Sequence, residues 1–371
     1  MDLSYWEQKT WFQSVDFTIV GSGIVGLNCA LKLRERFPKS KILVLERGVL
    51  PSGASTKNAG FACFGSLSEI LDDLENHSEE EVFNLVSQRL EGLNLLRKTL
   101  GDKDIGYEQH GGYEIFRKED TLTYNHCLQQ IEEVNTLLKP LFNKNIFEVV
   151  QNKFGFNKTQ DNQIYTSFEG QIDTGKMMVA LHKKAVQNNI NILNGVSLTQ
   201  YNETPKNVLI QLNNGFSFKT ENLFIATNGF AKQILDEDVL PARAQVLITK
   251  PIKDLKIKGT FHLDQGYYYF RNIDNRILFG GGRNLDFKTE ETTDFGLTPR
   301  VQSQLEIYLK EIILPETPHE IEYRWSGIMG VGTKKKPIVK QISERVFCGV
   351  RLGGMGVAIG SNIGNDLAGL C

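Results

Sequence analysis

The first clear pattern in the chain is an apolar run followed by an amphipathic one. Residues 15–20 (VDFTIV) are mostly β-branched or aromatic, which predicts a buried strand. Between residues 24 and 37 the apolar positions recur at a helical spacing, and Pro38 ends the predicted helix. A second apolar run, residues 41–45, predicts another strand. The pattern therefore predicts a βαβ unit near the start of the chain.

Later parts of the chain carry both strand and helix patterns. Residues 222–226 and 346–350 predict two further strands, each followed by a turn that contains glycine. Residues 68–104 predict helices, and residues 357–370 predict a last one. Residues 267–282 instead hold two strand-like runs around a short turn, which predicts an antiparallel hairpin. The chain thus combines α/β and α+β patterns, as in two domains with different sheets.

Three glycines lie at the junction between the first strand and the first helix. Gly21 permits a tight turn, Gly23 lets a pyrophosphate approach the backbone, and Gly26 lets the helix pack closely on the strand. The helix N-terminus adds free N–H groups and the positive end of the helix dipole. Glu46 follows about 20 residues later, where a carboxylate accepts ribose hydrogen bonds and would repel a 2′-phosphate. The loop therefore predicts a site for NAD or FAD, and disfavours NADP.

Composition narrows the class of protein. The 371 residues suggest two domains, and the formal net charge of −2 gives no reason to expect a nucleic acid partner. The five cysteines are scattered without CxxC spacing and the six histidines are dispersed, so we expect neither disulfides nor a metal site.

No apolar stretch reaches the ~18 residues of a transmembrane segment. The polar N-terminus lacks a secretory pattern, which favours a cytoplasmic location. We expect Trp6, Trp11 and Phe12 to pack residues 1–13 onto the body.

The loop after the second strand favours FAD over NAD. Residues 51–66 (PSGASTKNAGFACFGS) are rich in small and hydroxyl side chains and are too polar for a core. A domain that binds NAD more often continues with plain βα repeats, whereas this loop is suited to lie along an extended ligand. Near the end of the chain, a second glycine turn precedes the last predicted helix and can bring another helix N-terminus to the same ligand.

Eight segments together carry a resemblance to a known family. In chain order they are VGSGIVG with Glu46, GASTKNAG, GQIDTGKMMVALHKKA, LFIATNG, PARAQ, YYYFRNIDNRILFGGG, YRWSGIMGVGTKKKP and GGMGVAIGSNIGNDLA. Their order and spacing resemble those of the D-amino-acid oxidase, glycine oxidase and sarcosine oxidase (DAO) family of FAD flavoproteins. The resemblance covers nearly all of the chain.

The resemblance implies a discontinuous α/β Rossmann-like FAD-binding domain and an α+β substrate domain with an antiparallel sheet. The FAD-binding domain would comprise residues 14–105, 150–240 and 326–371. The substrate domain would comprise residues 106–149 and 241–325, with residues 1–13 as an N-terminal arm.

The resemblance also implies which residues contact FAD. The ADP part would contact Gly21, Gly23, Ile24, Gly26, Glu46, Arg47 and Val196, and the flavin side would contact Ser55, Thr56, Lys57, Asn58, Ala59, Gly60, Thr227, Gly229, Gly353, Gly354, Met355, Gly356 and Val357. The cysteine that tethers FAD in monomeric sarcosine oxidases has no counterpart near residues 328–332, so we expect non-covalent FAD.

The candidate catalytic residues are Arg271, Tyr268 and Met329. By resemblance, Arg271 occupies the strand position of a carboxylate-binding arginine, although it could instead cap the edge of the hairpin. Because facing alternates along a strand, either Tyr268 or both of its neighbours should face the pocket. Met329 stands where the glycine-oxidase-like pattern has a second arginine. Arg351 stands where many relatives carry glycine.

These features predict an FAD-dependent amine or amino-acid oxidoreductase that passes electrons to O2 or a redox partner. An FAD-linked 2-hydroxy-acid dehydrogenase is the main alternative, since related folds oxidise alcohols. A flavoprotein-like binding module without turnover would be colourless if it lacked flavin, and an NAD dehydrogenase would be colourless and stabilised by NAD.

Overall fold

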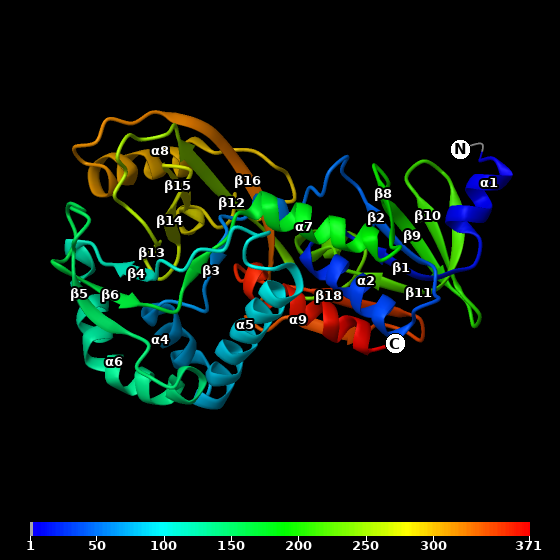
Figure 1. The fold of residues 1–371 in the computed structure, drawn as a ribbon, viewed down its shortest axis with the longest axis horizontal. Coiled ribbons are helices and arrows are strands. Elements are labelled where there is room, and N and C mark those ends of the chain that lie inside the picture. Colours follow the sequence, from blue (N-terminus) through cyan, green and yellow to red (C-terminus); the bar gives the residue numbers. More distant parts are fainter. Residues whose placement is uncertain (1–2) are drawn as a thin grey trace.

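The computed structural model describes residues 3–371, which form two large sheets with helices around them (Figure 1). One sheet is mostly parallel and holds the predicted βαβ unit. The other is mostly antiparallel and holds the predicted hairpin. The chain passes between the two sheets several times, so both are assembled from segments that are distant in sequence.

The first sheet is of the Rossmann type. Strands β18, β11, β1, β2 and β8 are neighbours in that order and run parallel, while β17 adds an antiparallel edge. Strands β9 and β10 extend the sheet as an antiparallel meander next to β11. The bounds are β1 Val15–Val20, β2 Ile42–Glu46, β8 Asn191–Asn194, β9 Leu198–Glu203, β10 Val208–Leu212, β11 Ser217–Ile225, β17 Ile338–Gln341 and β18 Val346–Val350.

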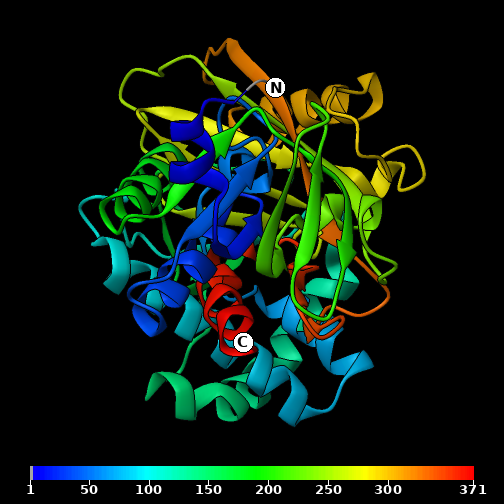
Figure 2. The ribbon, with the colours of Figure 1, turned by 90° about the vertical axis from the view of Figure 1, so that its right-hand side faces the viewer.

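Four helices share a core with one face of this sheet. They are α2 (Ile24–Arg36), α5 (Glu79–Leu100), α7 (Thr174–Gln187) and α9 (Gly356–Gly369), and their buried residues meet those of β1, β2, β11 and β18. Helices α2 and α9 lie side by side in both views (Figures 1 and 2). Helices α2 and α9 can therefore direct their N-termini toward one place.

The second sheet has the strand order β16, β12, β15, β14, β13, β4, β6 and β5. One face packs on α8 (Pro299–Tyr308) and the π-helical turn η5 (Leu309–Ile313), around stacked rings that include Phe261 and Phe270. The bounds are β4 Gly112–Ile115, β5 Glu148–Gln151, β6 Asn162–Thr166, β12 Leu240–Thr249, β13 Thr260–Leu263, β14 Tyr268–Ile273, β15 Arg276–Gly281 and β16 Ile321–Val331.

Shorter elements join the two sheets. Helices α4 (Leu67–Asn76) and α6 (Thr121–Phe142) enclose a separate apolar core beside the second sheet. A small sheet of two strands pairs β3 with β7. The remaining bounds are α1 Tyr5–Glu7, η1 Gln8–Phe12, α3 Ala54–Lys57, β3 Phe61–Ala62, η2 Lys118–Asp120, β7 Gly170–Gln171, η3 Asn228–Gln233 and η4 Arg283–Leu285.

The observed sheets move two of the expected domain boundaries. Strands β5 and β6 lie in the second sheet, although residues from 150 onward were expected in the FAD-binding domain. Strand β16 also lies in the second sheet as far as Val331, beyond the expected boundary at residue 326. The first of these segments continues a long excursion that began with β4 and ends after β6.

The N-terminal arm only partly matches its prediction. Phe12 packs against Phe216 and Phe218, and Trp11 lies against the same core. Trp6 does not pack onto the body, because 69% of it is exposed. All five cysteines are free. Among residues 3–371, no helix has both the length and the apolar character needed to cross a membrane.

Candidate active site

A cavity of about 590 Å³ lies between the two sheets. Its wall runs from the carboxyl ends of β1 and β2, along the loop of residues 51–60, to β13, β14 and β16 of the second sheet. This position at the carboxyl ends of parallel strands is where open α/β sheets bind ligands. We call the wall formed by the first sheet and its loops the cofactor half, and the wall formed by the second sheet and α4 the substrate half.

The glycine loop has the geometry that its sequence predicts. Gly21 has φ +107°, and a Cβ there would lie 2.7 Å from the carbonyl oxygen of Ala226. A Cβ on Gly26 would overlap the carbonyl oxygen of Gly21, so helix α2 can approach β1 only without a side chain at this position. Gly23 has an ordinary extended backbone, caps α2 without a side chain and lines the cavity. Glycine is therefore needed at position 23 because it leaves room in the cavity, and not because of its backbone conformation.

Glu46 is buried at the end of β2 and faces the cavity. One carboxylate oxygen accepts hydrogen bonds from the backbone N–H (3.2 Å) and hydroxyl (2.7 Å) of Ser22. The other accepts from the backbone N–H of Gly48 at 2.9 Å and from the Ser52 hydroxyl at 3.2 Å. These donors keep the carboxylate at the mouth of the glycine loop.

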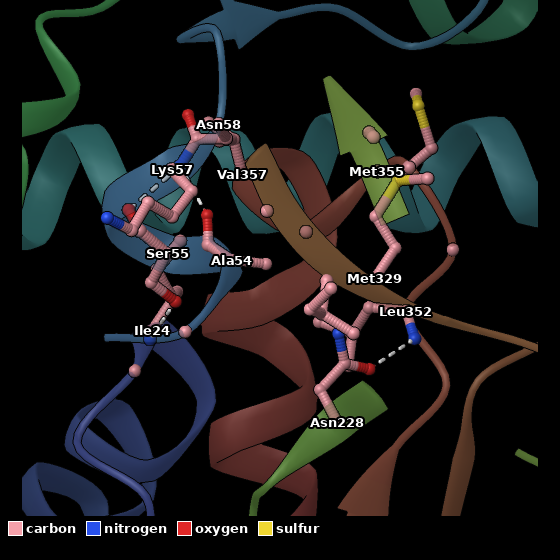
Figure 3. Close-up of a pocket in the computed structure, with 18 of the residues that line it drawn as sticks. Ile24, Ala54, Ser55, Lys57, Asn58, Asn228, Met329, Leu352, Met355 and Val357 are labelled. Atoms are coloured by element: carbon pink, nitrogen blue, oxygen red, sulfur yellow. Dashed lines mark hydrogen bonds between the residues drawn. The ribbon is translucent and has the colours of Figure 1, made fainter. Parts of the chain in front are cut away.

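The loop of residues 53–60 crosses from one sheet to the other. The hydroxyl of Ser55 accepts a hydrogen bond from the backbone N–H of Ile24 at 3.0 Å, which ties the loop to the start of α2 (Figure 3). The indole of Trp325 donates to the carbonyl oxygen of Lys57 at 2.9 Å and ties it to β16. Thr56 does not line the cavity, because its hydroxyl donates to the carbonyl oxygens of Pro51 and Gly53 within the loop.

The C-terminal glycine turn, residues 353–355 before α9, leaves open space in the cavity. The side-chain oxygen of Asn228 accepts from the backbone N–H of Leu352 at 3.1 Å and fixes the start of the turn (Figure 3). A Cβ built on Gly353 or Gly354 meets no heavy atom within 4 Å. Thr227 also lines the cavity, and its buried hydroxyl has no hydrogen-bond partner among residues 3–371. Space and an unsatisfied polar group both indicate a ligand here.

Most of the predicted cofactor residues line the cavity. They are Gly21, Gly23, Ile24, Glu46, Arg47, Ser55, Lys57, Asn58, Ala59, Gly60, Val196, Thr227, Gly353, Gly354, Met355, Gly356 and Val357. Besides Thr56, the exceptions are Gly26, which packs α2 on β1, and Gly229, where a Cβ would lie 2.5 Å from the carbonyl oxygen of Met329.

Tyr268 is not at the cavity, in contrast to its place among the candidate catalytic residues. It is 1% exposed and packs in the core of the second sheet against Tyr308, with ring centroids 4.9 Å apart. The neighbours on either side, Tyr267 and Tyr269, line the cavity instead, as one of the two predicted alternatives required. Met329 also lines it, as does Met355 (Figure 3).

Arg271 is also placed differently from the expected substrate contact. It is 2% exposed and does not line the cavity, because the loop segment before β3 covers it. Its guanidinium donates to the carbonyl oxygens of Ala59, of Ile172 at 2.9 Å and of Asn272 at 3.2 Å. Burial lowers the pKa of Arg271 to about 10, so the group remains cationic at neutral pH. The structure thus gives Arg271 a role in joining segments of the fold.

The substrate half contains charged residues that the sequence did not single out. His262 donates to the carboxylate of Glu169 at 2.9 Å, and its other ring nitrogen lies 3.9 Å from Glu69. Burial opposes its charge, yet these carboxylates raise the pKa of His262 to about 9. The thiol of Cys63 lies within 4.8 Å of the same imidazole and of Glu169. Because Glu169 already binds the imidazolium, this group is best described as a buried ion pair beside the cavity.

Arg351 has a structural role, and its backbone explains why glycine suits this position in relatives. Its φ is +63°, in the left-handed region that glycine adopts most easily. The guanidinium donates to the carboxylate of Asp238 at 2.6 Å and to the carbonyl oxygen of Lys336 at 3.0 Å. These bonds compensate for the unfavourable backbone and hold the end of β18 against neighbouring loops.

Comparison with known proteins decides the family. The sequence model of the DAO family of FAD-dependent oxidoreductases matches residues 16–370. The chain belongs to this family. It is 21% identical to "Probable oxidoreductase OrdL" of Haemophilus influenzae, over 97% of this chain and 83% of that protein.

Solved structures of the DAO family show the same fold. The glycine oxidase of Geobacillus kaustophilus is similar with a TM-score of 0.75 and 19% identity, covering 96% of this chain and 94% of that chain. The L-proline dehydrogenase of P. horikoshii is similar with a TM-score of 0.74 and 17% identity, covering 96% and 92%.

The cofactor of this DAO-family oxidoreductase is FAD, and the cofactor half fits it. The glycine loop and the N-terminus of α2 suit the pyrophosphate, and Glu46 suits a ribose. Arg47 and Lys57 line the same half and form no ion pair with the described residues, so they can balance phosphate charge. The space at Gly353 and Gly354 suits the remaining part of the molecule.

We expect Gly23→Val to abolish FAD binding. A Cβ at Gly23 would lie 2.8 Å from the hydroxyl of Ser55 and would occupy space that the pyrophosphate needs. Gly369→Val is the matched control, because a Cβ there meets nothing within 4 Å. FAD content per folded chain should fall to background in the first variant only. Equal FAD content in both variants would show that the loop serves packing alone.

We expect Arg271→Ala to destabilise the protein rather than to change substrate preference selectively. The change leaves buried carbonyl oxygens without a donor, and each lost bond to a charged group is worth roughly 1.5–3 kcal/mol. The urea midpoint of unfolding should therefore drop clearly, whereas Arg300→Ala, at a side chain that is 65% exposed, should leave it nearly unchanged. Normal stability combined with a loss of affinity for carboxylated substrates alone would restore the role expected from the sequence.

Proposed function

We propose that this enzyme oxidises the C–N bond of an amine or amino acid to an imine, which water then hydrolyses to a carbonyl compound. The observation that carries the proposal is the continuous cavity that joins the FAD cradle to an aromatic and thioether wall in the substrate half. Tyr269 and Met329 contribute to that wall, and Met355 of the cofactor half also lines the cavity. The names of the two solved relatives, a glycine oxidase and an L-proline dehydrogenase, also support it.

Bound FAD supplies an acceptor for a hydride at flavin N5. The chain then has to hold the carbon that gives up the hydride and to favour the amine in its neutral form. An apolar wall does the second task, because an ammonium group loses more solvation free energy there than a neutral amine. Tyr269 reflects the same environment, since burial raises its pKa to about 12. Met329 offers a flexible apolar surface that suits an alkyl substituent.

We expect the purified protein to be yellow and to release its FAD on acid precipitation. All five cysteines are free, and Cys63 is the only one of them that lines the cavity. Burial raises the pKa of the Cys63 thiol, which disfavours the reactive thiolate. The flavin should therefore appear in the supernatant. Flavin that remained in the protein pellet would overturn the non-covalent assignment.

We expect N-substituted or larger amines, with or without one carboxylate, to bleach the flavin faster than glycine or small D-amino acids. Met329 replaces a second ionic contact with an apolar one, which favours alkyl groups. Reduction should accelerate as pH rises toward the amine pKa, because only the neutral amine can lose the hydride. Anaerobic stopped-flow mixing, followed by flavin absorbance, measures both effects.

The same panel should include 2-hydroxy acids as the control for the competing function. Their failure to bleach the flavin, together with bleaching by amines, is the expected result. If hydroxy acids were the faster class, the enzyme would be a hydroxy-acid dehydrogenase. If small D-amino acids were faster than all bulkier amines, the argument from Met329 would fail. Reoxidation of the bleached enzyme in air-saturated buffer then tests O2 as the acceptor against a separate redox partner.

A further inference from the structure

Three cationic side chains line the substrate half of the cavity, and they differ in their partners. His262 pairs with Glu169, and Lys335 pairs with Asp72 at 2.8 Å and also with Asp73. Arg283 forms neither an ion pair nor a hydrogen bond through its guanidinium with any residue in the described range 3–371. It is half-buried and lies over the ring of Phe287, 4.7 Å from its centroid. Burial lowers the pKa of Arg283, while the charges of Tyr267, Glu290 and Glu291 act in the opposite direction without forming an ion pair with it.

The backbone holds Arg283 in a fixed place at the end of β15. Gly281 and Gly282 both have positive φ and turn the chain from the strand into the short helix η4. The backbone N–H of Gly282 donates to the carbonyl oxygen of Tyr267 at 3.0 Å. On the other side of Arg283, the amide of Asn284 donates to Asp264 at 2.8 Å.

The amide of Asn284 contacts the turn that connects β13 to β14. Asp264, Gln265 and Gly266 of this turn all have positive φ, and the last two line the cavity. Positive φ values are the ordinary geometry of a tight hairpin turn, so the pairing of β13 with β14 sets the position of these residues. The turn and η4 therefore form a pre-set edge of the cavity, and the guanidinium of Arg283 is attached to that edge.

We propose that Arg283 is the residue that binds the carboxylate of the substrate, in place of the buried Arg271. This inference rests on the proposed function, and it narrows the substrate to amines that carry a carboxylate. A guanidinium presents two parallel N–H donors that match a carboxylate, and its bonds are strongest where water is partly excluded. Tyr267 and Tyr269 of the same wall supply apolar surface for the rest of the molecule.

A phosphate of FAD is a poorer occupant for Arg283. The cofactor half already contains the N-terminus of α2, Arg47 and Lys57 for phosphate charge. Arg283 belongs to the second sheet, next to Tyr267 and the turn at Gly266. A Cβ on Gly266 would lie 2.6 Å from the carboxylate of Glu69 on α4, which places this edge against α4 rather than against the glycine loop.

The test compares the FAD-loaded wild type with Arg283→Gln, Arg283→Lys and the matched surface variant Arg300→Gln. Benzoate and acetate are titrated into the oxidised protein, and the dissociation constants are read from the perturbed flavin spectrum. Proline with pyrrolidine, and N-methylglycine with dimethylamine, then serve as carboxylated and carboxylate-free pairs in anaerobic reduction.

We expect Arg283→Gln to weaken carboxylate binding by roughly tenfold or more, the equivalent of one lost charge-assisted hydrogen bond. Arg283→Lys should keep part of the affinity, and Arg300→Gln all of it. The carboxylate-free amines should bind all four proteins equally. Equal weakening of both members of a pair, or a wild type that binds neither benzoate nor acetate, overturns the proposal. Loss of FAD from both Arg283 variants also overturns it, because Arg283 would then support the cofactor.

The experiment separates this inference from the proposed function. Benzoate and acetate report on the carboxylate site without any turnover. If they bind through Arg283 but no amine bleaches the wild-type flavin, the C–N oxidation proposal fails while the carboxylate site stands. If amines bleach the flavin and Arg283→Gln affects neither carboxylate ligand, the carboxylate site at Arg283 fails while the C–N oxidation proposal stands.

Discussion

A single buried guanidinium joins the parts of this protein that form its cavity. Arg271 leaves β14 of the second sheet and donates to the carbonyl oxygens of Ala59, in the loop after α3, and of Ile172, just after β7. Gly60 passes so close that a Cβ there would lie 2.7 Å from the guanidinium. A buried charge is tolerated only when its donors are satisfied. The loop, β7 and β14 must therefore meet in one arrangement for the fold to accept Arg271.

That constraint also positions the cofactor half. The loop of residues 53–60 is held near its start by the bond between Ser55 and Ile24, and near its end by the bond from Arg271 to Ala59. Trp325 of β16 fixes the middle through the carbonyl oxygen of Lys57. Because the loop is hydrogen-bonded to both sheets, it cannot move with one sheet without breaking its bonds to the other. The FAD cradle and the substrate wall therefore have a fixed position relative to each other.

The sequence predicted the first sheet better than the second. The βαβ unit and the last helix were placed to within one or two residues, since local periodicity and the glycine turns determine them. The assignment of β5, β6 and the last part of β16 to the second sheet could not be inferred in the same way. Those strands pair with partners that are distant in the chain, and their sequence patterns do not specify which sheet they join.

Arg271 and Arg283, in and next to the hairpin, differ in their exposure to the cavity, and the sequence pattern alone does not predict this difference. Alternation correctly puts Arg271 on the same face of β14 as Tyr269, which does line the cavity. Alternation cannot show that the loop at Ala59 covers the end of that face, because this contact spans 212 residues. Arg283 lies just past the end of β15, after three glycines that mark it as a turn residue, and the last two of these glycines have positive φ. Arg271 satisfies its charge with backbone carbonyl oxygens, whereas the guanidinium of Arg283 has no such partner among residues 3–371 and stays half-exposed at the cavity, where water or a ligand can accept its hydrogen bonds.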